Sequence, residues 1–378
     1  MDKNETIDNL RAAMGTLPSM APPKTTTFVK GCSKLKVEMV PDSGPTNPYR
    51  TFVESAGATW GNNEYLPKWS NLSPENRFKV ALAVLTKNTL PQAVEPVTWT
   101  WRVTGLPRNC FDQHARARIG STFFSIGSRD NNKLDADIIL YSNLFEKMFG
   151  GDPKCTCYKL PDGLSEKATA DWIQSEALGI TPFGKRALLV FCGIKNMYEE
   201  VLADGAGNWQ TARAFLPMSY HHSYHFSQNL LALQGQCARR MSFCEEEFIS
   251  GLHWMIRETV KEKFPLIANY LRPACDFSGK CLYAKSYSLS NAFGCLFASC
   301  GRHQSGTAYA TFNESCTNIE VLEQQLDTHI NRPNEWIEFT ENDYNKLDDK
   351  DKVLFEDNSN QTATTTNNNV VSLSYNKQ

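Results

Sequence analysis

The sequence lacks long hydrophobic runs, a strong net charge and a leader-like start, and each absence excludes a class of protein. No apolar run approaches the roughly 18 residues of a membrane-spanning helix, so we expect no membrane partner. The net charge of −2 gives no global attraction to nucleic acid. The start, MDKNETIDNLRAAMGTLPSM, lacks the basic residues and apolar segment of a signal peptide, so we expect a cytoplasmic protein.

The twelve cysteines are interpreted as thiols or metal ligands, because a disulfide framework is typical of secreted proteins. Late in the chain, the pattern Cys-x5-Cys-x13-Cys-x4-Cys-x2-His gathers metal-ligand residues in one segment. Four thiolates, or three with an imidazole, suit a tetrahedral structural zinc site; the alternative is a compact tail of reduced thiols. The segment contains Cys275, Cys281, Cys295, Cys300 and His303.

The composition predicts a folded core between two polar ends. Residues 1–28, with their prolines and threonine run, predict a mobile arm. The Asn/Thr-rich residues 356–378 predict a disordered tail. Between them we place a core domain at 29–272, the cysteine-rich tail at 273–305 and an acidic, weakly patterned extension at 306–355.

The core contains few strand patterns and many helix patterns, which predicts an α+β fold. Apolar residues at every second position predict strands within 33–40 and 97–105. Ser73 predicts a helix N-cap, and Pro265 is expected to end an amphipathic helix. The predicted helices cover 73–88, 183–205, 210–216 and 244–264.

The stretch DQHARARIGSTFFSIGSRD, residues 112–130, combines paired arginines with a glycine- and serine-rich loop. If the first part is helical, Gln113 and Arg116 share a face, while Arg116 and Arg118 point about 200° apart toward different neighbours. The loop leads to Arg129, and backbone N–H groups with an arginine fork suit a phosphate. The alternative is a solvated helix face followed by a flexible turn.

The wider segment TWTWRVTGLPRNCFDQHARARIGSTFFSIGSRD resembles the motif region of the flavin-dependent thymidylate synthases, also called thymidylate synthase complementing proteins. In that family an aromatic-rich strand leads into an Arg-His-Arg helix and a loop with serine and arginine. Four further segments resemble the family in the same order, so the resemblance covers about residues 35–303. They are LSPENRFKVALAVLTKNTLPQAVEP, MYEEVLADGAGNWQTARAFLPMSYHHSYHFSQN, ARRMSFCEEEFISGLHWMIRETVKEKFP and RPACDFSGKC…GCLFASCGR.

The resemblance implies a fold and a reaction. The fold is a central antiparallel or mixed sheet flanked by helices, here with a C-terminal extension. The reaction transfers the one-carbon unit of methylenetetrahydrofolate to C5 of dUMP, giving dTMP, with FAD as cofactor and NADPH as reductant. The protein supplies positioning and electrostatics, while flavin and folate carry the chemistry. The family works as a homotetramer with sites shared between subunits.

The resemblance also assigns site residues. The dUMP site would contain Gln113, Arg116, Gly127, Ser128, Arg129, Arg213 and Arg240. Of these, Arg116, Ser128 and Arg129 are the catalytic candidates, and Arg239 competes with Arg240 for its role. The FAD site would contain Glu95, His114, Arg118 and Asn229.

Several imidazoles of the family are missing here. Ala117 replaces the histidine of Arg-His-Arg, Pro96 replaces the histidine after Glu95, and another is lost near Leu90. The loop is about one residue out of register and has no glutamate. His114 precedes Ala117 by three, so on one helical face it would partly restore the lost contact with the flavin.

Two further interpretations stay open beside an active thymidylate synthase. One is a related C5 hydroxymethylase of pyrimidine nucleotides, in which the altered flavin surroundings change how the one-carbon unit is resolved. The other is a non-catalytic family member that binds a nucleotide or a partner. The retained arginines argue against a loss of catalytic activity, whereas the lost histidines argue for such a loss. The sequence does not decide between dUMP and dCMP.

The segment with His221, His222 and His225 is interpreted as exposed or core-capping.

Overall fold

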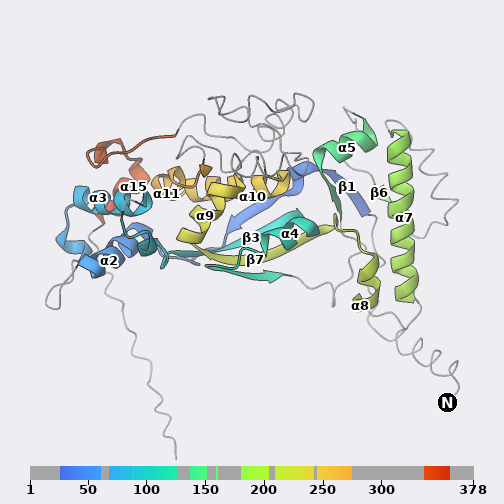
Figure 1. Ribbon diagram of the computed structural model, residues 1–378, viewed down its shortest axis with the longest axis horizontal. Coiled ribbons are helices and arrows are strands. Elements are labelled where there is room, and N and C mark those ends of the chain that lie inside the picture. The colour runs from blue at the N-terminus through green and yellow to red at the C-terminus, as the bar shows by residue number, and fades with distance from the viewer. Residues whose placement is uncertain are drawn as a thin grey trace, which may run out of the picture.

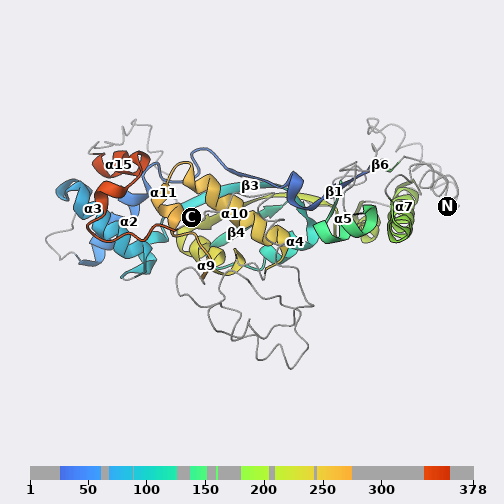
Figure 2. The ribbon, with the colours of Figure 1, turned by 90° about the horizontal axis from the view of Figure 1, so that it is seen from above.

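The structure is a computed structural model, and it describes residues 26–60, 68–87, 89–125, 137–150, 159–160, 180–203, 209–241, 245–274 and 336–357. Figure 1 shows an elongated molecule, with a group of helices at one end, a sheet along the middle and a long helix at the other end. Figure 2 shows the same order from above. Within the described ranges, no helix is long and apolar enough to cross a membrane.

The central sheet has four antiparallel strands in the order β2-β3-β7-β4. The strands are β2 (Lys36–Met39), β3 (Thr98–Pro107), β7 (His221–Asn229) and β4 (Ser121–Ser125). The two strands predicted from period-two patterns are confirmed as β2 and β3. Trp99, Trp101 and Val103 are buried on the inner face of β3, because alternate side chains of a strand point to the same face.

Helices cover the inner face of this sheet, where α9 (Leu230–Arg240) and α10 (Glu247–Lys261) lie above the strands in Figure 1. The amphipathic pattern of α10 is confirmed, since Phe248, Leu252 and Ile256 are fully buried. The helix ends before Pro265, which begins the short α11 (Pro265–Asn269). The α+β fold predicted from the sequence, an antiparallel sheet flanked by helices, is therefore confirmed.

A smaller mixed sheet, in the order β5-β1-β6, stands beside the first. Its strands are β1 (Thr26–Lys30), β5 (Ile138–Leu140) and β6 (Lys159–Leu160), and it packs with α5 (Ser142–Phe149) and α7 (Pro182–Ala203). The predicted arm at 1–28 was too long, because β1 begins at Thr26 and Phe28 is fully buried. The predicted helix at 183–205 is confirmed as α7. The one at 210–216 begins one residue earlier and is divided into α8 (Trp209–Ala212) and η4 (Arg213–Phe215).

The described part of the predicted acidic extension belongs to the core. Helix α15 (Asp349–Glu356) lies against α2 (Pro48–Trp60) and α3 (Pro74–Leu85), which begins as predicted after the N-cap Ser73. The predicted boundary between 355 and 356 falls inside α15 and is therefore wrong. The sequence pattern was weak because Asp351 and Phe355 are the only fully buried side chains of this helix.

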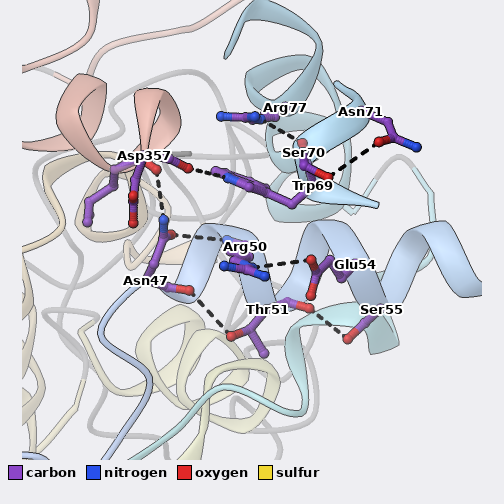
Figure 3. Close-up of polar contacts among 11 residues, drawn as sticks. Asn47, Arg50, Thr51, Glu54, Ser55, Trp69, Ser70, Asn71, Arg77 and Asp357 are labelled. Atoms are coloured by element: carbon purple, nitrogen blue, oxygen red, sulfur yellow. Dashed lines mark hydrogen bonds and ion pairs between the residues drawn. The ribbon is translucent and has the colours of Figure 1, made fainter. Parts of the chain in front are cut away.

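Backbone carbonyls at the end of α15 and at its C-cap, Asp357, accept hydrogen bonds from three side chains, as Figure 3 shows for part of this contact. The Nη1 atom of Arg77 lies 2.5 Å from the Phe355 carbonyl oxygen, and Nε1 of Trp69 donates to the Asp357 carbonyl at 2.8 Å. Asn47 donates to the Leu354 carbonyl at 2.7 Å. The last carbonyls of a helix have no partner within the helix, so these contacts satisfy the end of α15.

Candidate functional site

The arginine stretch forms a short helix and an exposed turn. Helix α4 (Arg108–His114) has Pro107 as its N-cap and ends with Ala115 as its C-cap. The helix considered through Arg118 therefore ends earlier, and the argument that Gln113 and Arg116 share a helical face, with Arg118 pointing elsewhere, does not apply. The chain turns because Gly120, at φ +67°, leads into β4, which pairs with β7.

Both arginines of this turn are exposed. Within the described residues, neither the Arg116 nor the Arg118 guanidinium has a hydrogen-bond or ion-pair partner. An arginine offers five N–H donors in a planar fork that matches a phosphate or carboxylate. The turn therefore presents two unused anion-binding groups at the end of α4.

A carboxylate joins two of the predicted nucleotide-site residues. The Oε1 atom of Glu245 lies 3.3 Å from Nε2 of Gln113 and 2.8 Å from Nη1 of Arg240. Arg240 is the last residue of α9, and Glu245 lies just before α10. Arg239 is exposed, so the geometry favours Arg240 over Arg239 at this site.

Three of the predicted FAD-site residues lie near one end of the central sheet. The backbone N–H of Asn229 donates to the Gly120 carbonyl at 2.9 Å, two residues after Arg118. The N–H of Leu230 donates to the Val97 carbonyl at 2.8 Å, two residues after Glu95. The backbones carrying Glu95, Arg118 and Asn229 therefore meet where β7 ends and α9 begins.

A close approach of Gly120 to the side chains of Asn229 and Ala232 fixes this junction. A side chain on Gly120 would meet the Asn229 amide and Ala232 at 2.8 Å, so only glycine fits here. The Asn229 side chain also caps α9, because its Oδ1 accepts from the Ala232 N–H at 2.8 Å. The arginine turn is thus held against the first turn of α9.

His114 lies in the core, with 3% of its surface exposed. Its Nδ1 atom is 2.7 Å from the Tyr224 hydroxyl, and its ring packs against Phe123 and Phe226. Burial lowers its pKa well below the usual value, so the ring is neutral. The basis of the flavin expectation is corrected, because α4 ends at His114 and the residue does not share a helical face with Ala117.

The histidine-rich segment forms strand β7, which the sequence interpretation missed. Its side chains alternate, with His222 buried and His225 exposed. His225 accepts a hydrogen bond from Nε of Arg102 at 3.2 Å, and His221 accepts one from the Gly105 N–H at 2.8 Å. These contacts agree with an exposed or core-capping segment. The alternation of His222, Tyr224 and Phe226 was the available signal for the strand.

The run of glutamates before α10 was also missed as a functional feature. Beside Glu245, the Glu246 carboxylate lies 3.0 and 3.2 Å from the Cys110 thiol, and Glu247 accepts from the Ser142 hydroxyl at 2.5 Å. Burial raises the pKa values of Glu246 and Glu247. Three consecutive carboxylates thus fasten α10 to α4 and α5, and no local pattern distinguishes such a run from a solvated one.

The remaining predicted residues are separated from this group. Arg213 is exposed on η4, close to Tyr220 just before β7; burial raises the pKa of Tyr220, and the charges of Arg108 and Arg213 partly offset this rise. No contact among the described residues joins Arg213 to Gln113 or Arg240. Gly127, Ser128 and Arg129 lie outside the described residues, as do all the candidate zinc ligands. Within the described part of the chain, no group of histidines, cysteines and carboxylates suits a metal ion.

The sequence matches a known family over most of this fold. Residues 46–266, more than half of the chain, match the sequence profile of the family described as thymidylate synthase complementing protein. The chain belongs to this family. It is thus an enzyme of the flavin-dependent thymidylate synthase type, as its motifs predict. No curated protein matches the chain in a sequence search.

Two solved structures are similar to this chain at low identity. One is a UMP/dUMP methylase, PolB, from Streptomyces cacaoi bound with 5-Br dUMP, with 15% identity and a TM-score of 0.43. The match covers 62% of this chain and 93% of that chain. The other is thymidylate synthase X from Helicobacter pylori with FAD and dUMP, with 13% identity and a TM-score of 0.40. The match covers 63% of this chain and 99% of that chain. The family assignment rests on the sequence profile.

Proposed function

We propose that this enzyme transfers the one-carbon unit of methylenetetrahydrofolate to C5 of dUMP, giving dTMP, with FAD as cofactor and NADPH as reductant. The observation that carries the proposal is the pairing of Gln113 with Arg240 through Glu245, beside a turn with two unused arginines. Family membership supports the reaction type. When bound, FAD supplies the redox chemistry.

The chain's own residues fit an anionic nucleotide and an anionic cofactor. In the proposal, Gln113, Arg116 and Arg240 bind dUMP, with Arg213 and the loop residues Gly127, Ser128 and Arg129. Arg116, Ser128 and Arg129 hold the phosphate and position the base for reaction. Arg118 binds the FAD pyrophosphate, supported by its exposed guanidinium, which has no partner among the described residues, with Glu95 and Asn229 beside it.

A homotetramer with shared sites would unite the separated nucleotide residues. Arg213 is exposed and has no contact with Arg240 among the described residues, so a second copy is needed to bring both to one nucleotide. The outer face of α7 supports self-association, because Leu189, Val190 and Met197 are exposed there at 39%, 62% and 46%. Light scattering of the purified protein tests the tetramer, and a monomeric mass contradicts it.

A hydroxymethylase acting on the same nucleotide position is the second candidate. The observation that favours it is the missing imidazole at Ala117, together with the buried position of His114. Both leave the flavin side of the site without a histidine from the arginine turn. A different environment of the flavin would change how the one-carbon unit is reduced. The two activities give different products from the same substrates.

The deciding experiment is flavin binding followed by product analysis. Absorbance of the purified protein with and without added FAD, then incubation with dUMP, methylenetetrahydrofolate and NADPH, separates the alternatives. Bound flavin with dTMP as product supports the proposal, and hydroxymethyl-dUMP supports the second candidate. A colourless protein that takes up no FAD would contradict both and indicate a non-catalytic nucleotide-binding member.

We also propose a structural zinc ion in the cysteine-rich segment. Its basis is the sequence alone, namely the spacing of Cys275, Cys281, Cys295 and Cys300. Metal analysis of protein purified without added zinc should find one zinc ion per chain. Replacing Cys281 and Cys295 by serine should abolish it, whereas full zinc content in that variant would contradict the assignment.

A further inference from the structure

We propose that Glu245 is a positioning residue that makes the nucleotide site select uracil over cytosine. It acts through the amide of Gln113 and the guanidinium of Arg240, both of which it contacts. The inference rests on the proposed function, because it concerns the base edge of the same nucleotide. It names the residue that decides between dUMP and dCMP.

The Glu245 carboxylate is placed to control both neighbours at once. One oxygen, Oε1, accepts from Nε2 of Gln113 at 3.3 Å and from Nη1 of Arg240 at 2.8 Å. The Glu245 side chain is 9% exposed and that of Arg240 is 27% exposed. Water therefore competes little for the carboxylate, and the pair of contacts is stronger than it would be on an open surface.

The carboxylate fixes which end of the Gln113 amide faces the site. A carboxylate only accepts hydrogen bonds, and a glutamine amide has a donating NH2 end and an accepting oxygen end. The NH2 end must therefore face Glu245, and the carbonyl oxygen must face away from it. Within the described residues this oxygen has no partner, so it is available as an acceptor.

Arg240 supplies the complementary donors. Its guanidinium has five N–H groups and no acceptor, and the contact with Glu245 orients the fork through Nη1. The two side chains held by one carboxylate oxygen thus present an acceptor next to donors. This pattern is fixed as long as Glu245 is ionised and in place.

The pattern matches uracil and opposes cytosine. Uracil has an N3–H donor between two carbonyl acceptors, so N3–H can donate to Gln113 while a carbonyl accepts from Arg240. Cytosine has an acceptor at N3 and a donating amino group at C4. Cytosine would set its N3 lone pair against the Gln113 oxygen and its amino group against Arg240. Sites built to pair a polar group reject an analogue that leaves the group unpaired.

Isothermal titration of dUMP and dCMP into the full-length protein tests this role. The Glu245→Gln variant keeps the size of the side chain, but its amide can donate as well as accept, so the Gln113 amide is free to turn. Wild type should prefer dUMP, and the variant should lower the dUMP-to-dCMP affinity ratio by about tenfold or more while still binding dUMP. Both ligands carry the same phosphate, so a general change of charge cancels in the ratio.

A matched control and a second variant separate positioning from folding. Glu54→Gln removes a carboxylate that pairs with Arg50 at 3.2 Å on α2, far from α4 in Figure 1, and should leave the ratio unchanged. Gln113→Leu alone should lower the dUMP-to-dCMP affinity ratio. Adding Glu245→Gln to the Gln113→Leu variant should lower this ratio little further, because Glu245 acts through Gln113. If Glu245→Gln does not fold, the Gln113→Leu result decides.

An unchanged ratio in Glu245→Gln that still binds dUMP overturns the inference while leaving the proposed function intact. A wild type that binds dCMP more tightly than dUMP overturns the inference and also the choice of dUMP as substrate in the proposed function. A wild type that binds neither nucleotide overturns the proposed function and this inference together.

Discussion

The carboxylate of Asp351 and the hydroxyl of Tyr49 are joined by a buried hydrogen bond of 2.5 Å between Oδ1 and Oη. The second oxygen of Asp351 accepts the backbone N–H of Leu266 at 2.8 Å. One side chain of α15 thus ties the C-terminal segment to α2 and to α11. Burial raises the pKa of Asp351 to about 7, despite these stabilising hydrogen bonds.

This raised pKa predicts a pH-dependent stability. In the unfolded chain Asp351 ionises near its ordinary value of 3.8, whereas in the folded protein it holds its proton to about pH 7. The folded state then binds more protons, so the stability contributed by this group is present at low pH and is lost as the pH rises toward and through 7. Urea unfolding of wild type and Asp351→Asn at pH 5, 6, 7 and 8 measures it. The stability of wild type relative to the variant should fall across this range.

The control for this prediction is Asp349→Asn on the same helix. The Asp349 side chain is 98% exposed and pairs with Lys352 at 3.6 Å. Its replacement should leave the slope of stability against pH as in wild type. A wild-type advantage over Asp351→Asn that grows with pH would contradict the sign assigned here.

Phe355 should contribute strongly to the stability of the whole domain. Its ring is fully buried and stacks on Tyr49 with centroids 4.5 Å apart. Phe355→Ala should lower the free energy of unfolding by about 3–5 kcal/mol, because it leaves a cavity among aromatic rings. Val353→Ala, at a position 64% exposed, should change it by about 0.5 kcal/mol or less. A small effect of Phe355→Ala in urea unfolding would mean that the segment is not part of the cooperative core.

The sequence predicted the elements whose buried residues are apolar and regularly spaced. Strand β3, with Trp99 and Trp101, and helix α10, with its apolar face, are of this kind. Strand β7 was missed because its inward side chains include His222 and Gln228, which do not read as apolar. Helix α15 was missed because two buried side chains give no periodicity. Its position is set by contacts with α2 and α3, which are distant in the sequence.

For the site, the sequence predicted residue types but not their arrangement. The family motif named Gln113 and Arg240, while the carboxylate that joins them comes from a glutamate run with no local signal. The turn at Arg116 and Arg118 was considered as part of a helix, and alanine and arginine do favour helices. The glycine at position 120 and the pairing of β4 with β7 override that preference.

His114 is expected to act on stability rather than on flavin affinity. The ring is enclosed by Tyr224, Phe123 and Phe226, and 3% of its surface is exposed. His114→Ala should lower the free energy of unfolding by about 2–4 kcal/mol through the cavity that it leaves, with FAD affinity close to that of wild type. His225→Ala, on the exposed side of β7, should change stability little. A loss of FAD affinity in folded His114→Ala would restore the direct flavin role.

Arg118 should be required for FAD affinity. Its guanidinium is exposed on the turn that meets Asn229 and has no partner in the part of the chain that the structure describes, so it is available for the charge-assisted hydrogen bonds that a pyrophosphate accepts. Arg118→Ala should weaken FAD binding by at least about tenfold, since hydrogen bonds to charged groups contribute about 1.5–3 kcal/mol. Quenching of FAD fluorescence on titration with protein gives the affinity. Arg102→Ala removes another exposed arginine, which pairs with Glu38 on the outer face of β3, and this variant should bind FAD as wild type does. An equal loss of FAD affinity in both variants would indicate a general effect of charge. An unchanged FAD affinity in Arg118→Ala would mean that this residue is not part of the flavin site.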